Sequence, residues 1–378
     1  MRKSAIVLGF GAFFLTCGLL FKFYAYPRLA VVPLDQNTRQ VVEGPDSTYL
    51  DVENLKITTG LLTTVATVIG DPDASKAASE ETGRDLAVWD KGQSTDNNGE
   101  APPATAGTDR VVFDRYTGEA VNCCGELIDG VAAQHSGLVV KFPFQTQQKT
   151  YQYWDGTLQK PFPIDFKGEE EIEGVKAYRF EQSVPKEKYT ALEVPGFLFG
   201  QASDSPAIMA DRYYENERVI WVEPETGVML KVSEHQKQFL EAPGVNPIVA
   251  LDTVSVFTPE TVKKNADEFG QKATLLKMVR STFPITLGIL GVALLAIGLL
   301  MAAAKLGRNK VAASGATAPR GAASGAAAGS ARPSKPPVRT NASSSAQTKP
   351  VRTTPTTSGE GGIDLSKGSG KPDESGRG

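Results

Sequence analysis

The stretch STFPITLGILGVALLAIGLLMAAA, residues Ser281 to Ala304, carries no charged side chain over 24 residues. A helix needs roughly 20 apolar residues to cross about 30 Å of hydrocarbon, so this stretch is long enough to span a membrane. Pro284 lies in its first turn, where the missing amide hydrogen costs least. A buried core helix is the alternative, and charged residues on both flanks disfavour it. The sequence therefore predicts a transmembrane helix over residues 281–304.

A second uncharged stretch, SAIVLGFGAFFLTCGLLF, covers 18 residues from Ser4 to Phe21. Lys22 follows it, and Phe23, Tyr24 and Tyr26 then supply aromatic side chains of the kind that lie at a membrane interface. A cleaved signal peptide is the alternative. The bulky residues FKFYAY before Pro27 offer no small-x-small cleavage site, so we predict a second transmembrane helix over residues 4–26.

Positive charge flanks both predicted spans on the side that faces the chain ends. Because cytoplasmic flanks carry excess Lys and Arg, both termini are predicted to be cytoplasmic in a two-pass protein of the cell membrane. The orienting residues are Arg2 and Lys3 before the first span, and Lys305, Arg308 and Lys310 after the second. Lys277 and Arg280 weakly oppose this orientation. Residues 1–3 would then be the cytoplasmic N-terminus, and residues 27–280 would lie outside.

The segment 305–378 differs in composition from the rest of the chain. It carries twelve Lys and Arg against four Asp and Glu, although the whole chain has a formal charge of −3. It is rich in Ala, Gly, Ser, Pro and Thr. Such composition cannot bury a core, so a disordered, basic cytoplasmic tail is predicted.

Short apolar runs separated by turn residues fill the region 27–258. Hairpin turns are expected at Asp155-Gly156, Glu173-Gly174 and Pro224–Gly227. Further candidate strands are residues 28–34, 48–57, 61–69, 86–89, 110–113, 138–142 and 248–257. The fold class is therefore a mainly β extracytoplasmic domain, an antiparallel curved sheet, half-barrel or sandwich, anchored by two transmembrane α-helices.

Two segments of the outer region depart from the strand pattern. Residues 71–108 are rich in Asp, Ala, Gly, Ser, Pro and Asn, and are expected to form a long surface excursion around the run 86–89. Thr258-Pro259-Glu260 is a helix start, with Thr as N-cap, Pro at the first position and an acid in the first turn. An amphipathic stalk helix is predicted over residues 259–280, either packed on the sheet or lying on the membrane surface.

The stretch DRYTGEAVNCCGELIDG, residues Asp114 to Gly130, holds two adjacent cysteines, Cys123 and Cys124. The third cysteine, Cys17, lies within the first predicted span. Outside the membrane the environment is oxidising, so a disulfide between the adjacent pair is predicted, with a bond to another chain as the alternative. Zinc is disfavoured, because the pair lacks the usual ligand spacing and a Cys or His partner cluster.

The sequence gives no catalytic signal. The two histidines, His135 and His235, lie outside any G-x-S-x-G or H-E-x-x-H pattern, and no phosphate-binding loop occurs. The acidic outer region disfavours nucleic acid as a partner. We therefore expect no enzymatic activity, no cofactor and no metal, and the oligomeric state stays open.

The layout resembles an actinobacterial family known as porin-PorA-like, of unknown function. The resemblance rests on the basic start, the stretches YPRLAVVPLD, WDKGQ and DRYTGEAV, the two spans and the low-complexity tail, over residues 1–305. It implies a membrane-anchored protein of the cell envelope, and some relatives are implicated in envelope lipid handling. The family supplies no catalytic motif to transfer to this chain.

Two hairpins, FKGEEEIEGVKAYRFE and VIWVEPETGVMLKV, resemble those of bacterial half-barrels that carry lipoproteins or lipids. That resemblance implies an apolar cavity, for which the candidate lining residues are Phe180, Phe197, Phe199, Trp221, Val222 and Leu230. The alternative is that these residues are core.

Three functions follow from these observations. The first is an outer domain that binds or helps to handle an envelope lipid or glycolipid, with the membrane, that lipid and envelope-assembly proteins as partners. The second is a scaffold for cell-wall or envelope assembly proteins. The third is an oligomeric channel. It ranks last because a membrane β-barrel needs an apolar band on every strand, whereas these strands carry many charges. Two helices form a pore only when several copies assemble.

Overall fold

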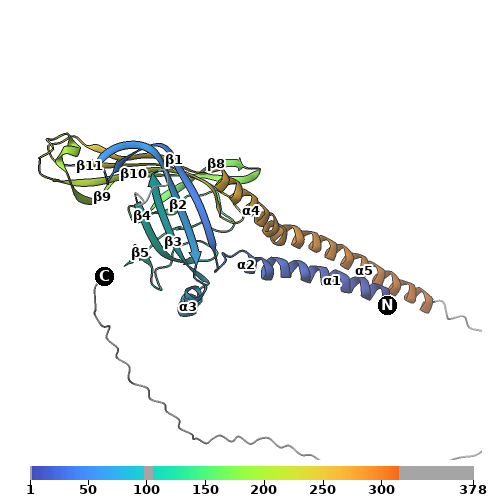
Figure 1. Ribbon diagram of the computed structural model, residues 1–378. Coiled ribbons are helices and arrows are strands. Elements are labelled where there is room, and N and C mark those ends of the chain that lie inside the picture. The colour runs from blue at the N-terminus through green and yellow to red at the C-terminus, as the bar shows by residue number, and fades with distance from the viewer. Residues whose placement is uncertain (1, 98–104, 315–378) are drawn as a thin grey trace, which may run out of the picture. The chain divides into compact units, whose positions relative to one another are not determined.

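The computed structural model describes residues 2–97 and 105–314, and the predicted tail beyond residue 314 lies outside them. Two long helical segments run side by side (Figure 1). The first comprises α1 (Arg2–Leu20), the π-helical turn η1 (Phe21–Ala25) and α2 (Tyr26–Leu29). The second comprises α4 (Pro259–Lys277), the π-helical turn η3 (Met278–Thr282) and α5 (Phe283–Ser314). Both are long and apolar enough to cross a membrane, over Lys3–Leu29 and Pro259–Lys305.

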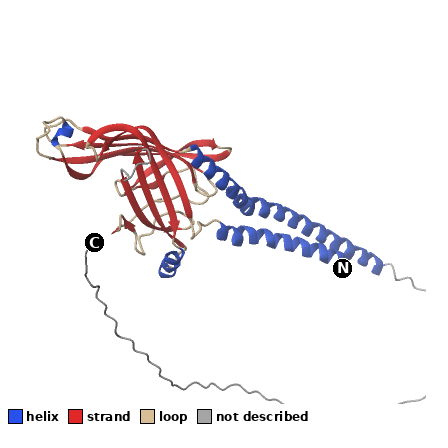
Figure 2. Cartoon of the chain, in the orientation of Figure 1, coloured by secondary structure: helices blue, strands red, loops and turns tan. Residues whose placement is uncertain are grey.

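Between the helical segments the described residues form one sheet of twelve strands, shown red in Figure 2. Its spatial order is β6-β5-β4-β3-β2-β1-β12-β11-β10-β9-β8-β7, and all neighbouring strands are antiparallel. The strands are β1 (Asn37–Asp51), β2 (Lys56–Gly70), β3 (Leu86–Asn97), β4 (Thr105–Asp114), β5 (Leu127–Ile128), β6 (Val131–Ala132), β7 (Tyr151–Asp155), β8 (Lys160–Ile172), β9 (Val175–Val194), β10 (Ile208–Val222), β11 (Met229–Glu241) and β12 (Ile248–Phe257). The predicted fold class, an antiparallel curved sheet with two apolar helices, is confirmed.

The turn chemistry explains the hairpins. Glu173 and Gly174 connect β8 to β9 with φ of 49° and 76°, the two left-handed residues that a type I′ turn requires. Gly227 has φ of 73°, and a Cβ there would lie 2.1 Å from the carbonyl oxygen of Phe142. Only glycine fits that position, and the loop before β11 is thereby held against the segment that precedes β7.

The two ends of the sheet are linked through irregular segments. Isolated bridges join Phe113 of β4 to Ala120, Glu119 to Leu138, and Leu138 to Tyr153 of β7. The sheet therefore curls until β4 and β7 are connected around a hollow interior. Bulges in β1, between Gly44 and Ser47, and in β9, at Tyr189, accompany this curvature.

Two predicted strands, 28–34 and 138–142, are wrong, and a third, 48–57, is strand only at its two ends. Residues 28 and 29 are the last residues of helix α2, and residues 30–34 follow as coil. Residues 48–57 contain the β1–β2 turn, in which the Asp51 side chain accepts from the backbone N–H groups of Glu53 and Asn54. Residues 138–142 pair only at Leu138, and the Phe142 N–H donates instead to Gly227.

The surface excursion expected over residues 71–108 is also wrong. These residues include β3 and a helix, α3 (Pro72–Thr82). Asp71 caps α3 by accepting from the Ala74 N–H at 2.9 Å, and Gly83 ends it with φ of 69°. This Asp-Pro start and glycine stop are the sequence signal that would have located the helix.

The predicted stalk helix is α4, and Thr258 is its N-cap, accepting from the Thr261 N–H. Val262, Ala266, Ala273 and Leu276 are buried on one face. The Asn265 amide donates to the Met229 carbonyl at 3.3 Å, which places α4 on β11. The helix therefore packs on the sheet before it continues through η3 into α5.

Candidate functional site

The two candidate membrane helices, α1 and α5, form an antiparallel pair that is held together at glycines. A Cβ on Gly11 would lie 2.9 Å from the backbone nitrogen of Leu295, and a Cβ on Gly291 would lie 2.9 Å from the carbonyl oxygen of Gly11. Backbones approach this closely only where a side chain is absent. The outward faces carry large apolar side chains, and Phe10, Ile289 and Leu300 are 55%, 68% and 70% exposed.

Glu225, in the β10–β11 loop, connects both helical segments to the sheet. Its Oε1 accepts from Arg280 Nε at 2.7 Å and its Oε2 from Arg280 Nη2 at 2.9 Å, a bidentate pair. The Tyr26 hydroxyl also donates to Oε1, at 3.3 Å. Tyr26 begins α2 of the first segment and Arg280 lies in η3 of the second, so one carboxylate contacts both helical segments.

The loop that carries Glu225 is itself held in place. The Glu223 carboxylate accepts from the Glu225 N–H at 3.0 Å, the Thr226 N–H at 2.7 Å and the Thr226 hydroxyl at 2.6 Å. Burial raises the pKa of Glu223, against the effect of these hydrogen bonds. The loop is therefore a preorganised attachment point for Arg280 and Tyr26.

Inside the curled sheet lies a cavity of about 910 Å³. Part of its wall consists of residues two apart along a strand, which share one face of a sheet: Thr38 and Gln40, Lys91 and Gln93, Gly107 and Asp109, and Glu234 and Gln236. Tyr214 and Arg218 of β10 also border it. Leu275, Leu276 and Val279 border it from the second helical segment. The cavity thus has a polar wall on the strands and an apolar border beside the helices.

A buried ionic network forms part of the polar wall. Arg218 donates to Glu234, to Gln182 and, at 3.3 Å, to Asp155, whose Oδ2 also accepts from the Tyr214 hydroxyl at 3.1 Å. The side chains of Arg218 and Asp155 are 8% and 1% exposed. Nearby acids raise the pKa of Arg218 although burial opposes them, so the guanidinium stays charged.

The residues predicted to line an apolar cavity lie elsewhere. Phe180 and Val222 pack in a core cluster with Phe142, Tyr151 and Ile164, and Leu230 packs with Trp221 and Ala177. Phe197, in the 3-10 turn η2 (Gly196–Phe199), is 39% exposed, and Phe199 packs at a cluster with Val194 and Leu240. These residues are core or surface, and the described residues that border the cavity are a different set.

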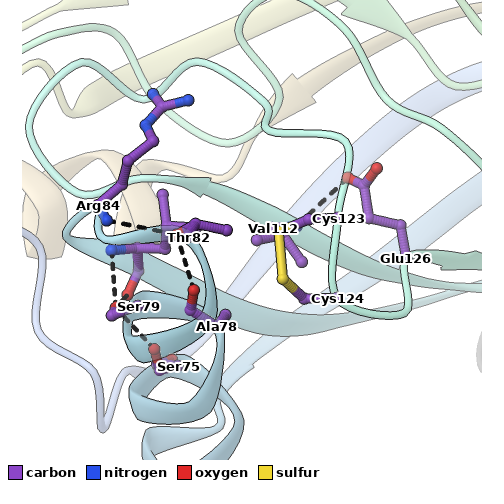
Figure 3. Close-up of a disulfide and its surroundings, with 10 residues drawn as sticks. Ser75, Ala78, Ser79, Thr82, Arg84, Val112, Cys123, Cys124 and Glu126 are labelled. Atoms are coloured by element: carbon purple, nitrogen blue, oxygen red, sulfur yellow. Dashed lines mark hydrogen bonds between the residues drawn. A yellow bond between two sulfur atoms is a disulfide. The ribbon is translucent and has the colours of Figure 1, made fainter.

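Cys123 and Cys124 are joined by a disulfide, and they pack against Ala78 of α3 and Val112 of β4 (Figure 3). Glu126 lies beside the pair and accepts from the Val112 N–H at 3.4 Å and from the His135 N–H at 3.3 Å. Cys17 is free in α1. Within residues 2–97 and 105–314, no three His, Cys, Asp or Glu side chains form a group that could hold a metal ion.

Comparison with known proteins gives the family. The family model described as Porin PorA matches residues 3–300. The chain belongs to the porin PorA family. A protein named Porin PorA from Corynebacterium resistens is 28% identical over 305 residues, which cover 60% of this chain and 74% of the relative. Another of that name, from Corynebacterium amycolatum, is 28% identical over 299 residues, covering 61% and 75%.

These findings correct the functional ranking made from the sequence. The family and both relatives carry the name of a porin, so an envelope-lipid binder, ranked first, and a scaffold, ranked second, are overturned in favour of the channel, ranked third. The lipid hypothesis named four lining residues from two hairpins, and these four, Phe180, Trp221, Val222 and Leu230, pack as core. The family and the two apolar helices identify a membrane protein.

Proposed function

We propose that the chain is a subunit of a membrane channel, in which several copies assemble their α1–α5 pairs around a conducting path. The observation that carries the proposal is the helix pair of a porin-family chain. The glycine contacts bring the two helices of one copy close together, so no passage is left between them. The outer faces of the pair are available to further copies of this porin-family chain. The chain has no catalytic role in this proposal.

The sheet is assigned to the aqueous side because its exposed side chains form ion pairs. Lys160 pairs with Glu187, Lys186 with Glu241, and Lys188 with Asp211. Exposed charged pairs along a strand are incompatible with hydrocarbon, where a porin barrel carries an apolar band. The membrane path is therefore assigned to the helices.

The orientation proposed is two-pass, with both termini cytoplasmic and residues 27–258 outside. It follows the positive flanks at Lys3 and Lys305, while the side chains of Arg2, Arg308 and Lys310 lie outside the described residues. Intact cells treated with a membrane-impermeant phosphine and then an impermeant maleimide should gain label at Cys123 and Cys124. Labelling only after cell lysis would reverse the orientation.

Conductance tests the channel directly. The full chain, purified in a non-ionic detergent and added to a planar bilayer, should give stepwise currents, and the same preparation should contain an oligomer by native mass spectrometry. A monomer that inserts into the bilayer without current would overturn the proposal.

A further inference from the structure

The Cys123–Cys124 disulfide bridges adjacent residues, so it connects no two distant parts of the chain. A disulfide that closes a long loop stabilises a protein by restricting the unfolded chain, whereas this bond closes no loop beyond its own ring. Both cysteines are half-buried and lie between the exposed residues Asn122 and Gly125. Breaking the bond is therefore expected to change the local segment and to leave the rest of the fold in place.

The bond holds a backbone conformation that cysteine does not favour. Cys124 has φ of 61° and Gly125 has φ of 84°, so two consecutive residues are left-handed. Glycine adopts this conformation without steric conflict, but a residue with a Cβ does so at a cost in free energy. While the sulfurs are bonded, the ring restricts Cys124 to few conformations. Once they are separate thiols, the residue is free to leave the left-handed region, and the turn opens.

The pair lies between a helix and a strand. Cys123 and Cys124 pack with Ala78 of α3 and Val112 of β4 in one apolar cluster (Figure 3). Two thiols must lie at non-bonded contact, which is farther apart than two bonded sulfurs, so reduction adds volume to this cluster. A close-packed interior accommodates added volume only when its neighbours shift. The added volume therefore favours the open form of the turn.

Glu126 connects the turn to the neighbouring strand. It comes directly after Gly125, and its carboxylate accepts from the backbone N–H groups of Val112 and His135 at 3.4 and 3.3 Å. Both hydrogen bonds are buried. Movement of the turn therefore displaces Glu126 and weakens two buried contacts with the rest of the domain.

The short strand β5, which follows this segment, forms part of the cavity wall. Ile128 of β5 pairs with Asp109 of β4. Ile128 and the following Asp129 border the cavity, and Asp129 accepts from the Thr108 N–H at 2.8 Å. A strand of two residues makes few hydrogen bonds of its own, so its position depends on the turn that precedes it. The state of the disulfide thereby reaches this side of the cavity.

We propose that the Cys123–Cys124 disulfide is a redox switch that controls the β5 side of the cavity. A dithiol is the reductant: its thiolate attacks one sulfur of the pair, the S–S bond breaks, and a mixed disulfide forms. The second thiol of the reductant then attacks this mixed disulfide and leaves with its partner as a disulfide. Two electrons and two protons pass to the pair, which ends as two thiols. The switch depends on the fold of the outer domain alone and is independent of the channel.

Hydrogen exchange measured by mass spectrometry tests the switch. The full chain carrying Cys17→Ser, which removes the free thiol of α1, is compared with and without dithiothreitol in a non-ionic detergent. Alkylation followed by peptide mass verifies that both thiols have formed. Peptides from residues 119–135 should exchange about 10-fold faster after reduction, which roughly matches the cost of one left-handed residue. Peptides from β10 and β11 should exchange equally in both states, and reoxidation should restore the slow rate.

One variant separates a switch from a structural clip. Cys123→Ser/Cys124→Ser, made in the same Cys17→Ser chain, cannot form the bond. It should therefore exchange like the reduced chain and should not respond to dithiothreitol. Three results would overturn the proposal: an unaltered rate over residues 119–135 after verified reduction, faster exchange throughout β10 and β11, or a bond that the dithiol reduces only in denaturant.

Discussion

Glu225 and Arg280 form a bidentate ion pair between the β10–β11 loop and the π-helical turn η3, with oxygen–nitrogen distances of 2.7 and 2.9 Å. Their side chains are 10% and 34% exposed, and Tyr26 of the first helical segment donates to the same carboxylate. One carboxylate therefore ties both helical segments to the sheet, in addition to the packing of α4 on β11.

Replacing this carboxylate should loosen that link. Glu225→Gln keeps the side-chain volume but removes the negative charge, and we expect a loss of about 1–2 kcal/mol in the free energy of unfolding, after allowing for the partial exposure of Arg280. Thermal unfolding in detergent measures the change. Asp267→Asn, which breaks an exposed pair with Lys263 on α4, is the control and should leave the melting temperature unaltered. Equal effects of the two variants would remove the special role of Glu225.

Lys141 should make stability depend on pH. Burial lowers its pKa from 10.5 to about 7, with Asp114 and Glu223 partly opposing the shift. Between about pH 7 and pH 10.5 the unfolded chain binds a proton that the folded chain does not, so stability rises with pH, by at most about 1.4 kcal/mol per pH unit. Below pH 7 the cost of burying the ammonium is present in full.

Lys141→Met isolates this effect. The variant should be more stable than the unaltered chain at pH 6, and its advantage should shrink as the pH is raised towards 9. Melting temperatures of both proteins across that range test the prediction. Parallel curves would show that the Lys141 amine does not titrate in this window.

The glycine contacts predict how the helix pair responds to added volume. Gly11→Ala places a methyl group against the backbone of Leu295 and should destabilise the pair by about 1–3 kcal/mol. Gly9→Ala is the matched control, because a Cβ there meets nothing within 4 Å and the substitution should only improve helix propensity. Unfolding in detergent compares them, and a stable Gly11→Ala protein would contradict the packing described.

The ionic network on the cavity wall should tolerate no missing partner. Arg218→Met leaves Asp155 and Glu234 without their cation, and Asp155 is almost fully buried, so a loss of about 3–5 kcal/mol is expected. Arg84→Met removes an exposed pair with Asp114 and should cost far less. Similar urea midpoints for the two variants would show that the network is solvated.

The two apolar helices and the antiparallel β class of the region between them could be predicted from the sequence. Uncharged runs of 18 and 24 residues are recognised as candidate spans without any tertiary information, because the thickness of the hydrocarbon sets the length that a span needs. Local chemistry likewise determined Thr258 as the start of α4 and Glu173-Gly174 as a hairpin turn. The end of the first helical segment was missed because residues 28–34 have a strand-like composition. Helix α3 was missed because its polar composition outweighed the Asp71 cap and the Gly83 stop.

Only the tertiary structure decided what lies inside the sheet. Alternation along each strand shows which residues share a face, but not which face becomes the interior when a sheet curls. Phe180 and Trp221 therefore could not be told apart from cavity residues by sequence, although they pack as core. Lys141, Trp89 and Trp154 lie far apart in the chain, and only the curvature that joins β4 to β7 gathers them beside one cavity. The Glu225–Arg280 pair depends in the same way on a long-range contact, which no local pattern encodes.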